Sequence, residues 1–457
     1  MKAITDRHTD QLIHNIFLTT YQQIMPQLPK NDGLSKRLSL LRENALFRSL
    51  NTETRDFIVS IASRHRLTFQ QLLQLTEIDI DLRMWDEPPV VEQWIELEKQ
   101  VTQDSDRKAG RIIFERLRQQ RLLLIHKETV YGHPARPLSR DWTKKKITTH
   151  EGNNTVFGMC PVASEKTVCC NLRTIDAVHG CGFGCNYCSI QTFYQPSDIS
   201  VDRNLATKLG NISLDPQKNY HICSGQSSDS LFVGDRFGVL TALLDFARRN
   251  PNIILELKTK SKNITALLKA DVPRNIFVSW SLNPQAVIDH EEYFTAALSE
   301  RLAAARSVAD KGILTGFHLH PMIHYCGWQS DYNALIQKVM SMFSGKEIAL
   351  VSFGTLTFIK PTIKNLRMKA LPSKVLQMPL EEAAGKLSYP VRIKEKMFRT
   401  VWQAFTPWHD SVFFYLCMEN RELWQSVFGF CYDNNDAFEK ALLRQVSGKV
   451  SQDLLGI

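Results

Sequence analysis

From residue 171 onward, short apolar segments that resemble strands alternate with longer segments that resemble helices. The strand-like segments are NLRTIDAV, NYHICSG, NIILELKT, NIFVSWSL, GILTGFHLHP and EIALVSFG. The helix-like segments between them are RFGVLTALLDFARRN, KNITALLKA, LSERLAAARSVADK and SDYNALIQKVMSMF. This alternation predicts an α/β fold with a parallel sheet, and six units are too few for a complete eight-unit barrel. We expect a partial (β/α)6 barrel whose ligand site lies at the carboxyl ends of the strands.

The stretches on either side of this core have a different character. Apolar residues recur near every 3.6 positions in residues 10–25, 55–75 and 107–126, and paired prolines open another helix-like segment at 85–101. Near the end of the chain, helix-like segments surround one strand-like segment, SVFFYLCME. We therefore predict three parts: a helical N-terminal domain with a basic connector over 1–150, a barrel core over 151–375, and a small α+β C-terminal extension packed on the core over 376–457.

No run of the 457-residue chain approaches the eighteen or so apolar residues that cross a bilayer, and the start of the chain is polar. We therefore expect a cytoplasmic protein. Cysteines stay reduced in that compartment, so a tight group of them indicates metal binding or catalysis rather than disulfides.

Three of the ten cysteines, Cys181, Cys185 and Cys188, fall within HGCGFGCNYCSIQTFY at residues 179–194, just past the first predicted strand. A structural zinc site normally takes four ligands, so zinc here would need a distant fourth donor such as a histidine. Three thiolates on a 4Fe–4S cluster would instead leave one iron open to another ligand. Thiolates suit both metals, so the ligand type alone does not decide between them.

The spacing C-x3-C-x2-C after a first strand resembles the radical S-adenosylmethionine (SAM) superfamily, and CGFGCNYCSIQTFY resembles the cluster loop of its spore photoproduct lyase family. The stretches ELKTKSKNITALL, FVSWSLNPQAVI and SERLAAARSVADKGILTGFHLHPMIHYCGW are similar to successive stretches of that family, so the resemblance covers roughly residues 171–430. It implies a 4Fe–4S cluster that binds SAM, and an external electron donor such as flavodoxin or ferredoxin. Reductive cleavage of SAM then gives a 5′-deoxyadenosyl radical, which in the family reverses a thymine dimer in spore DNA.

The resemblance also implies roles for individual residues. The cluster ligands are Cys181, Cys185 and Cys188, the SAM contacts are Ser228, Asp229, Lys260 and Ser281, and Tyr187 takes part in catalysis. This chemistry is reasonable, because a lysine can pair with the SAM carboxylate while serine and carboxylate oxygens can bond ribose hydroxyls.

Two positions depart from the family pattern. Gln226 stands where the family has the cysteine that returns a hydrogen atom, and Ser189 stands where it has the partner of the tyrosine at 187. Cys223 is the nearest substitute donor, but an offset of three along a strand reverses the face of the side chain. We therefore expect SAM cleavage to be retained and repair of spore photoproduct to be poor or absent.

Other residues have more than one interpretation. Cys160, Cys169 and Cys170 precede the first strand, where they could ligate a second metal, return a hydrogen atom, or be small buried residues. His318 and His320 lie on one face of the fifth strand, with His324 beyond. They could bind a metal or act as acid and base, but we expect a hydrogen-bonded pair that lines the barrel. We expect five further residues to be core: Cys326, Cys417, Phe413, Phe414 and Tyr415.

The charge of +9 is concentrated in one region. Residues 107–146 hold twelve Lys and Arg against three acids, so the rest of the chain sums to zero. On the predicted helix there, Arg107, Arg111, Arg118 and Arg121 fall within an arc of about 80°. Such a stripe is either a solvated face or a contact for nucleic-acid phosphates.

Three hypotheses for the function follow. We favour a radical SAM enzyme related to spore photoproduct lyase that acts on nucleic acid, either repairing a lesion or modifying a base. The second hypothesis is a radical SAM enzyme that acts on a peptide or a small molecule. The third is a nucleic-acid-binding protein with a structural metal site, and iron and sulfide content would separate it from the other two.

Overall fold

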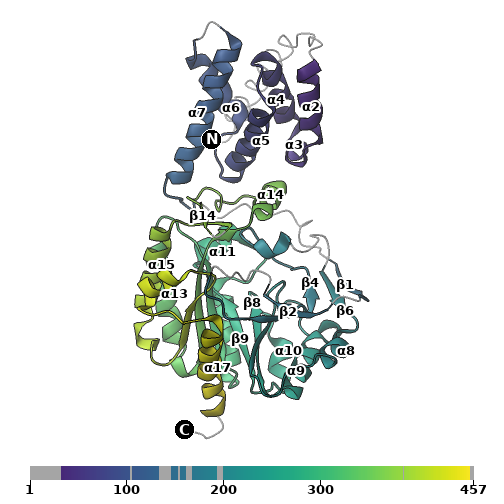
Figure 1. Ribbon diagram of the computed structural model, residues 1–457, viewed down its shortest axis with the longest axis vertical. Coiled ribbons are helices and arrows are strands. Elements are labelled where there is room, and N and C mark those ends of the chain that lie inside the picture. Colours follow the sequence, from purple (N-terminus) through teal and green to yellow (C-terminus); the bar gives the residue numbers. More distant parts are fainter. Residues whose placement is uncertain are drawn as a thin grey trace, which may run out of the picture. The chain divides into compact units, whose positions relative to one another are not determined.

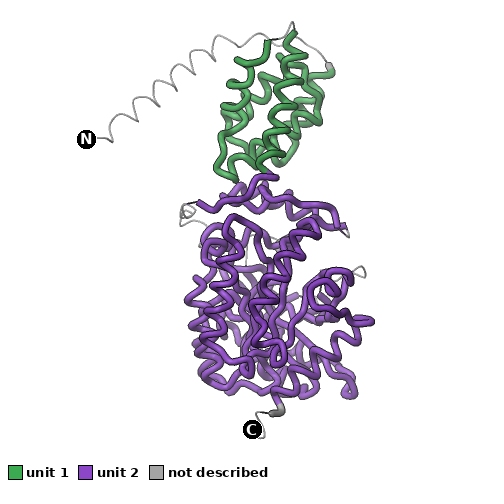
Figure 2. The backbone as a smooth tube through the Cα atoms, turned by 90° about the vertical axis from the view of Figure 1, so that its left-hand side faces the viewer, with its two compact units in different colours: residues 1–124 green, residues 125–457 purple. Residues whose placement is uncertain are grey.

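The computed structural model describes residues 32–102, 105–132, 146–152, 155–160, 167–192, 199–383 and 385–452. The chain forms two compact units, residues 1–124 and residues 125–457, which Figure 2 shows in green and purple. The second unit includes both the barrel and the C-terminal elements. The predicted boundaries at residues 150 and 375 remain predictions.

The first unit is helical, as the periodicity predicts. Its helices are α2 (Asp32–Glu43), α3 (Ala45–Ser49), α4 (Thr52–Arg64), α5 (Phe69–Met84), α6 (Val90–Gln100) and α7 (Asp106–His126), of which α7 ends just inside the second unit. The apolar stretch over 55–75 is divided between two helices, because Thr68 caps the start of α5 by accepting a hydrogen bond from the Gln71 amide. The helix expected at residues 10–25 lies outside the described residues.

The second unit is built on a sheet in the order β16-β12-β11-β9-β8-β7-β3-β2. The bounds of these strands in chain order are β2 (Phe157–Met159), β3 (Arg173–Ile175), β7 (Tyr220–Ser224), β8 (Ile253–Thr259), β9 (Ile276–Ser281), β11 (Thr315–Met322), β12 (Ile348–Thr355) and β16 (Phe413–Leu416). Every neighbouring pair is parallel except β2 and β3. The six predicted core strands are confirmed, and the C-terminal strand β16 extends the same sheet.

Helices flank this sheet as the alternation predicts. The four expected helices are α9 (Val239–Arg249), α10 (Thr265–Lys269), α12 (Leu298–Asp310) and α13 (Trp328–Met342). Three short helices were not predicted: α8 (Leu205–Gly210), α11 (Gln285–Glu291) and α14 (Lys360–Lys369). In Figure 1, α13 lies toward one side of the sheet and α9 and α10 lie toward the other. All eight residues of β12 are buried, as expected of a parallel strand that is covered on both faces.

The C-terminal helices are α15 (Val391–Ala404), α16 (Arg421–Phe428) and α17 (Asn435–Gln452). Helix α17 contacts β7, β8, β12 and β16, so it packs against strands from both halves of the sheet. No helix in the described part of the chain is long and apolar enough to cross a membrane.

The described part of the unit also contains three small sheets. The first joins β1 (Ile147–His150), β6 (Ile199–Asp202) and β4 (Val178–His179), and the second joins β13 (Thr357–Phe358), β15 (Lys386–Ser388) and β14 (Glu381–Ala383). The third pairs β5 (Gly184–Cys185), inside the cysteine loop, with β10 (Glu292–Tyr293). This last pair fixes the cysteine loop against the segment that follows β9.

Candidate active site

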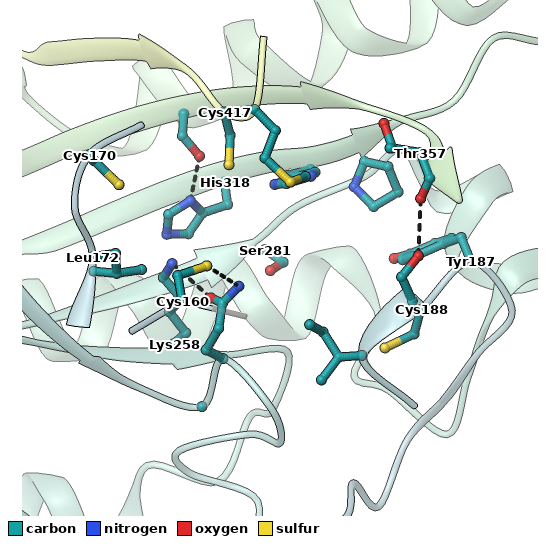
Figure 3. A pocket seen from close by; sticks show the side chains of 18 of the residues that line it. Cys160, Cys170, Leu172, Tyr187, Cys188, Lys258, Ser281, His318, Thr357 and Cys417 are labelled. Atoms are coloured by element: carbon teal, nitrogen blue, oxygen red, sulfur yellow. Dashed lines mark hydrogen bonds between the residues drawn. The ribbon is translucent and has the colours of Figure 1, made fainter. Parts of the chain in front are cut away.

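A pocket lies at the carboxyl ends of the sheet strands, where a parallel sheet is expected to bind its ligand. Its walls include Gln226 after β7, Lys260 after β8, Ser281 at the end of β9, and His318 and His320 on β11. Figure 3 shows Tyr187, Cys188 and Thr357 at one end of this pocket, and Cys160, Cys170 and Cys417 at the other.

The predicted cluster ligands Cys181, Cys185 and Cys188 all line this pocket. The loop that carries them packs tightly, because a Cβ atom added to Gly182 would lie 2.2 Å from the ring atom Cζ of Phe232. Cys185 is buried, and the other two are partly exposed to the pocket. Burial raises the pKa of the Cys185 thiol well above its usual value, and the Glu292 carboxylate raises it further. A metal's positive charge would reverse this effect.

The donor chemistry of the loop fits a 4Fe–4S cluster, because three soft thiols stand on one short loop that faces a pocket. In the described residues, no group of three or more cysteine, histidine or acidic side chains is already arranged as a metal site. The fit therefore rests on the kind of donors and on their shared loop. The assignment of the three ligands remains a prediction.

The cysteine loop is hydrogen-bonded to a buried ion pair, Glu292–Arg301, which the sequence analysis did not identify. The Tyr187 hydroxyl donates a hydrogen bond to Glu292 Oε1, which also accepts one from Asn283 Nδ2 at 2.8 Å. Arg301 Nη2 lies 2.5 Å from Glu292 Oε2, and both side chains are fully buried. Although burial alone would raise it, Arg301 and then Lys260 lower the pKa of Glu292 to about 2. Glu292 is therefore held as a carboxylate at neutral pH.

The four predicted SAM contacts, Ser228, Asp229, Lys260 and Ser281, all line the pocket. Neither serine side chain makes a hydrogen bond to another described residue, so both hydroxyls can bond a ligand. The Lys260 ammonium lies 5.9 Å from the centre of the Tyr187 ring. Lys260 can therefore present a positive charge beside the cysteine loop.

Asp229 has a different position from the other three. Its Oδ1 accepts hydrogen bonds from the amides of Leu231 and Phe232 and from Thr259 Oγ1, and its Oδ2 accepts one from the Lys260 amide at 2.6 Å. Burial raises its pKa, and these hydrogen bonds act in the opposite direction. Its carboxylate therefore joins the loop after β7 to the end of β8.

The two catalytic candidates differ in exposure to the pocket. Tyr187 lines the pocket, but its hydroxyl is bonded to Glu292. Cys223 is fully buried on β7 and is not a pocket-lining residue, whereas Gln226 is. The hydrogen-donor role of Cys223 thus remains a prediction without geometric support. Ser189 lines the pocket and donates a hydrogen bond to the Thr357 carbonyl at 3.0 Å.

A second buried network lies at the pocket floor around Glu256 on β8. Its Oε1 lies 2.6 Å from both His318 Nε2 and Ser279 Oγ, and its Oε2 lies 3.0 Å from His221 Nε2 and 3.7 Å from Lys258 Nζ. Burial opposes ionisation, but Lys258 and His318 hold the Glu256 pKa well below its usual value. Two ionisable residues inside the apolar segment NIILELKT were the available sequence signal.

The expectation for the two histidines is met in part, since both line the pocket but a ring hydrogen bond is found for His318 alone among the described contacts. Burial lowers the pKa of both imidazoles, to about 3 for His320. His324 lies elsewhere, with its ring near Trp328 and Tyr389.

The structure corrects two expectations for core cysteines. Cys417 lines the pocket, because it follows the end of β16 at the carboxyl edge of the sheet. Cys326 is exposed, because it lies in the turn after β11. The expected core residues Phe413, Phe414 and Tyr415 are buried, and Tyr415 also lines the pocket.

The predicted basic stripe is only partly a free surface. Arg118 is exposed but pairs with Glu115 at 2.6 Å. Arg121 pairs at 2.6 Å with the buried carboxylate of Asp81, so it has a structural role inside the first unit. Arg107 and Arg111 are exposed and form no ion pair with a described residue. The basic residues Arg136, Arg140, Lys144 and Lys145 lie outside the described ranges.

Comparison with known proteins gives one consistent family. The family model "Spore photoproduct lyase" matches residues 170–394. Spore photoproduct lyase of Clostridium acetobutylicum is 24% identical over 220 residues, and that of Geobacillus sp. is 24% identical over 217 residues. Each alignment covers 46% of this chain and 63% of the relative, so the chain spans less than two thirds of the length of these curated relatives.

Solved structures agree on the fold. A spore photoproduct lyase variant with dinucleoside spore photoproduct has a TM-score of 0.52 and 23% identity, and the match covers 63% of this chain and 88% of that one. Another variant, with bound AdoMet and dinucleoside spore photoproduct, has a TM-score of 0.51 and 21% identity, with coverage of 67% and 94%. These matches support the partial barrel, and the substrate is a separate question.

Proposed function

Because the spore photoproduct lyase family model matches residues 170–394, we propose that this protein is a radical SAM enzyme that acts on nucleic acid. The observation that carries the proposal is the pocket at the carboxyl ends of the strands. Three loop cysteines and Lys260 line this pocket, together with Ser228 and Ser281, whose hydroxyls make no hydrogen bond to another described residue.

In this proposal, Cys181, Cys185 and Cys188 hold a 4Fe–4S cluster beside the SAM site. When bound, the cluster and SAM supply a 5′-deoxyadenosyl radical, with electrons from a donor such as flavodoxin or ferredoxin. Lys260 pairs with the SAM carboxylate, and Ser228 and Ser281 bond its polar groups. Asp229 acts indirectly, because its hydrogen bonds hold the loops on which Ser228 and Lys260 stand.

Two observations support nucleic acid as the substrate class. The relatives are named for a DNA lesion, and their solved structures carry the dinucleoside form of that lesion. The first unit also presents two exposed arginines on α7, Arg107 and Arg111, which form no ion pair with another described residue. The particular lesion or base is open, because Gln226 and Ser189 replace the family's donor cysteine and second tyrosine.

We predict that the protein cleaves SAM but converts spore photoproduct poorly or not at all. The O–H bond of a serine is much stronger than a thiol S–H bond, and an amide offers no comparable hydrogen atom. The test is anaerobic incubation with a synthetic spore photoproduct dinucleotide, SAM and dithionite, using a genuine lyase as the positive control. The matched variant is Gln226→Cys, which returns a thiol to the pocket wall. Efficient conversion by the unmodified chain would contradict the prediction.

We also predict that Arg107→Gln/Arg111→Gln weakens nucleic-acid binding and flattens its salt dependence. Each lost phosphate contact lowers the slope of log K against log salt concentration by about 0.9 on duplex DNA. The control is Arg42→Gln/Arg48→Gln, which removes the same charge from exposed positions on α2 and α3 of the same unit. Equal slopes for the two double variants would mean that the stripe is a solvated face. Arg121 is not substituted, because its loss would leave the buried Asp81 carboxylate without its ion-pair partner.

A further inference from the structure

Four cysteines outside the cluster loop line the same pocket, and they come from three separate segments. Cys160 follows β2, Cys169 and Cys170 precede β3, and Cys417 follows β16. We propose that these four thiols form a second metal site of the four-cysteine class, which takes Zn²⁺ or an iron–sulfur cluster. These four cysteines are separate from the three proposed cluster ligands, so metal binding by them can be tested without the proposed reaction.

Backbone hydrogen bonds hold the three segments together. Strands β2 and β3 pair with Met159 opposite Arg173, and the Cys160 amide donates to the Leu172 carbonyl at 2.9 Å. This contact places Cys160 two residues from Cys170 across the ladder.

Backbone hydrogen bonds also hold the segment that carries Cys417 beside the segment that carries Cys169 and Cys170. Val168 and Glu419 form an antiparallel bridge, in which the Val168 amide donates to the Glu419 carbonyl at 2.9 Å. The Cys417 amide donates to the Phe353 carbonyl on β12 at 2.8 Å. The segment with Cys169 and Cys170 therefore lies directly beside the segment with Cys417, although about 250 residues separate them in the sequence.

All four side chains line the same pocket. Figure 3 shows Cys160, Cys170 and Cys417 around His318, at the end of the pocket away from Cys188.

The chemistry of the surroundings suits a thiolate site. Four cysteines complete the ligand set of a closed zinc site, and thiolates equally hold iron–sulfur clusters. The Lys258 ammonium interacts electrostatically with Cys170 and Cys417, and so offsets the negative charge that several thiolates would bring. All four cysteines are free of disulfides.

Ligation requires the thiols to turn inward. No group of three donors is already in metal geometry in the described residues, and the same holds for the loop cysteines. A cysteine sulfur is placed by one side-chain dihedral angle, whereas the backbone hydrogen bonds fix where its Cα lies. A bound metal would tie the segment before β3 to the end of β16 and close this end of the pocket.

The test uses the full chain with Cys181→Ala, Cys185→Ala and Cys188→Ala, so that the loop cannot bind metal. This variant is stripped of metal and titrated anaerobically with Co²⁺, whose visible and charge-transfer bands report tetrahedral thiolate coordination. We expect one Co²⁺ per chain, displaced by Zn²⁺. A parallel reconstitution with iron and sulfide shows which occupant the site prefers.

Adding Cys160→Ser or Cys417→Ser to this background should remove stoichiometric Co²⁺ binding, because serine keeps the size of the side chain but is a poor soft-metal ligand. Adding Cys326→Ser, at an exposed cysteine outside the pocket, should leave binding intact. Circular dichroism of each variant checks that it is folded. The proposal is overturned if the loop variant binds no stoichiometric Co²⁺, or if binding survives both added substitutions.

These outcomes are separate from those for the proposed function. A chain that forms 5′-deoxyadenosine but whose loop variant binds no Co²⁺ refutes only the second site. A loop variant that binds Co²⁺, in a protein whose parent never cleaves SAM, refutes only the radical SAM proposal.

Discussion

Replacing Cys185 with alanine is expected to abolish 5′-deoxyadenosine formation. Cys185 lies in the centre of the cysteine loop, and its strand β5 pairs with β10, so no other cysteine can take its place without unpairing that strand. The proposed cluster has three thiolate ligands, and this variant would leave two. The measurement is the yield of 5′-deoxyadenosine after anaerobic reconstitution, with SAM and dithionite.

The matched control is Cys326→Ala, which removes an exposed cysteine outside the pocket and should keep full activity. Total iron is a less direct readout, because the proposed second thiolate site would retain metal when the loop cannot. Undiminished 5′-deoxyadenosine from the Cys185→Ala protein would remove the basis of the proposed function.

Replacing Arg301 with methionine should lower the free energy of unfolding of the second unit by about 3–5 kcal/mol, because it leaves a buried carboxylate without its counter-charge. Arg301 is fully buried and donates to Glu292, to Thr295 Oγ1, and to the carbonyls of Ser281 and Ala296. The measurement is denaturant unfolding followed by tryptophan fluorescence. The control is Arg306→Met on the same helix, because the ion-pair partners of Arg306, Asp310 and Glu347, are partly exposed. Loss of these ion pairs should lower the free energy of unfolding by about 1 kcal/mol or less.

The pH dependence distinguishes this ion pair from simple packing. The pKa of Glu292 is about 2 in the folded protein and about 4.3 in the unfolded chain. The stabilisation that its ionised carboxylate contributes is therefore complete above about pH 4.3 and is lost as the pH falls toward 2. Without Arg301 the buried carboxyl group is easier to protonate. The stability difference between the two proteins should therefore narrow as the pH is lowered from 6 to 3. A difference that stays constant over this range would mean that lost packing, rather than charge, causes the destabilisation.

The local patterns of the sequence were sufficient for the core of the fold. A strand that is buried on both faces must be apolar along its length, so β8, β9, β11 and β12 could be identified one at a time. The cysteine loop could be found because its signal is also local: C-x3-C-x2-C places three thiols on one short loop. The strand ends then located the pocket, because parallel strands end at the same edge of a sheet.

The sequence could not predict features that depend on contacts between segments far apart in the chain. An apolar stretch shows that a strand is buried but not which strand it pairs with, so SVFFYLCME could not be placed beside β12. The same limit hid the fact that Cys417 lines one pocket with Cys160, Cys169 and Cys170. It also hid the Glu292–Arg301 pair, because a charged residue in a sequence does not reveal whether a partner compensates its burial.

The sequence by itself thus determined the alternating α/β core, the cysteine loop and the edge of the sheet where the pocket lies. These depend on periodicity and spacing within a few residues of one another. Only the tertiary structure decided the availability of each polar group: Asp229 is bonded to its own loops, Arg121 to a buried carboxylate, and Gln226 rather than Cys223 faces the pocket. The reason is physical, because a side chain's freedom to bind a ligand is set by the hydrogen bonds and charges that folding brings to it from elsewhere in the chain.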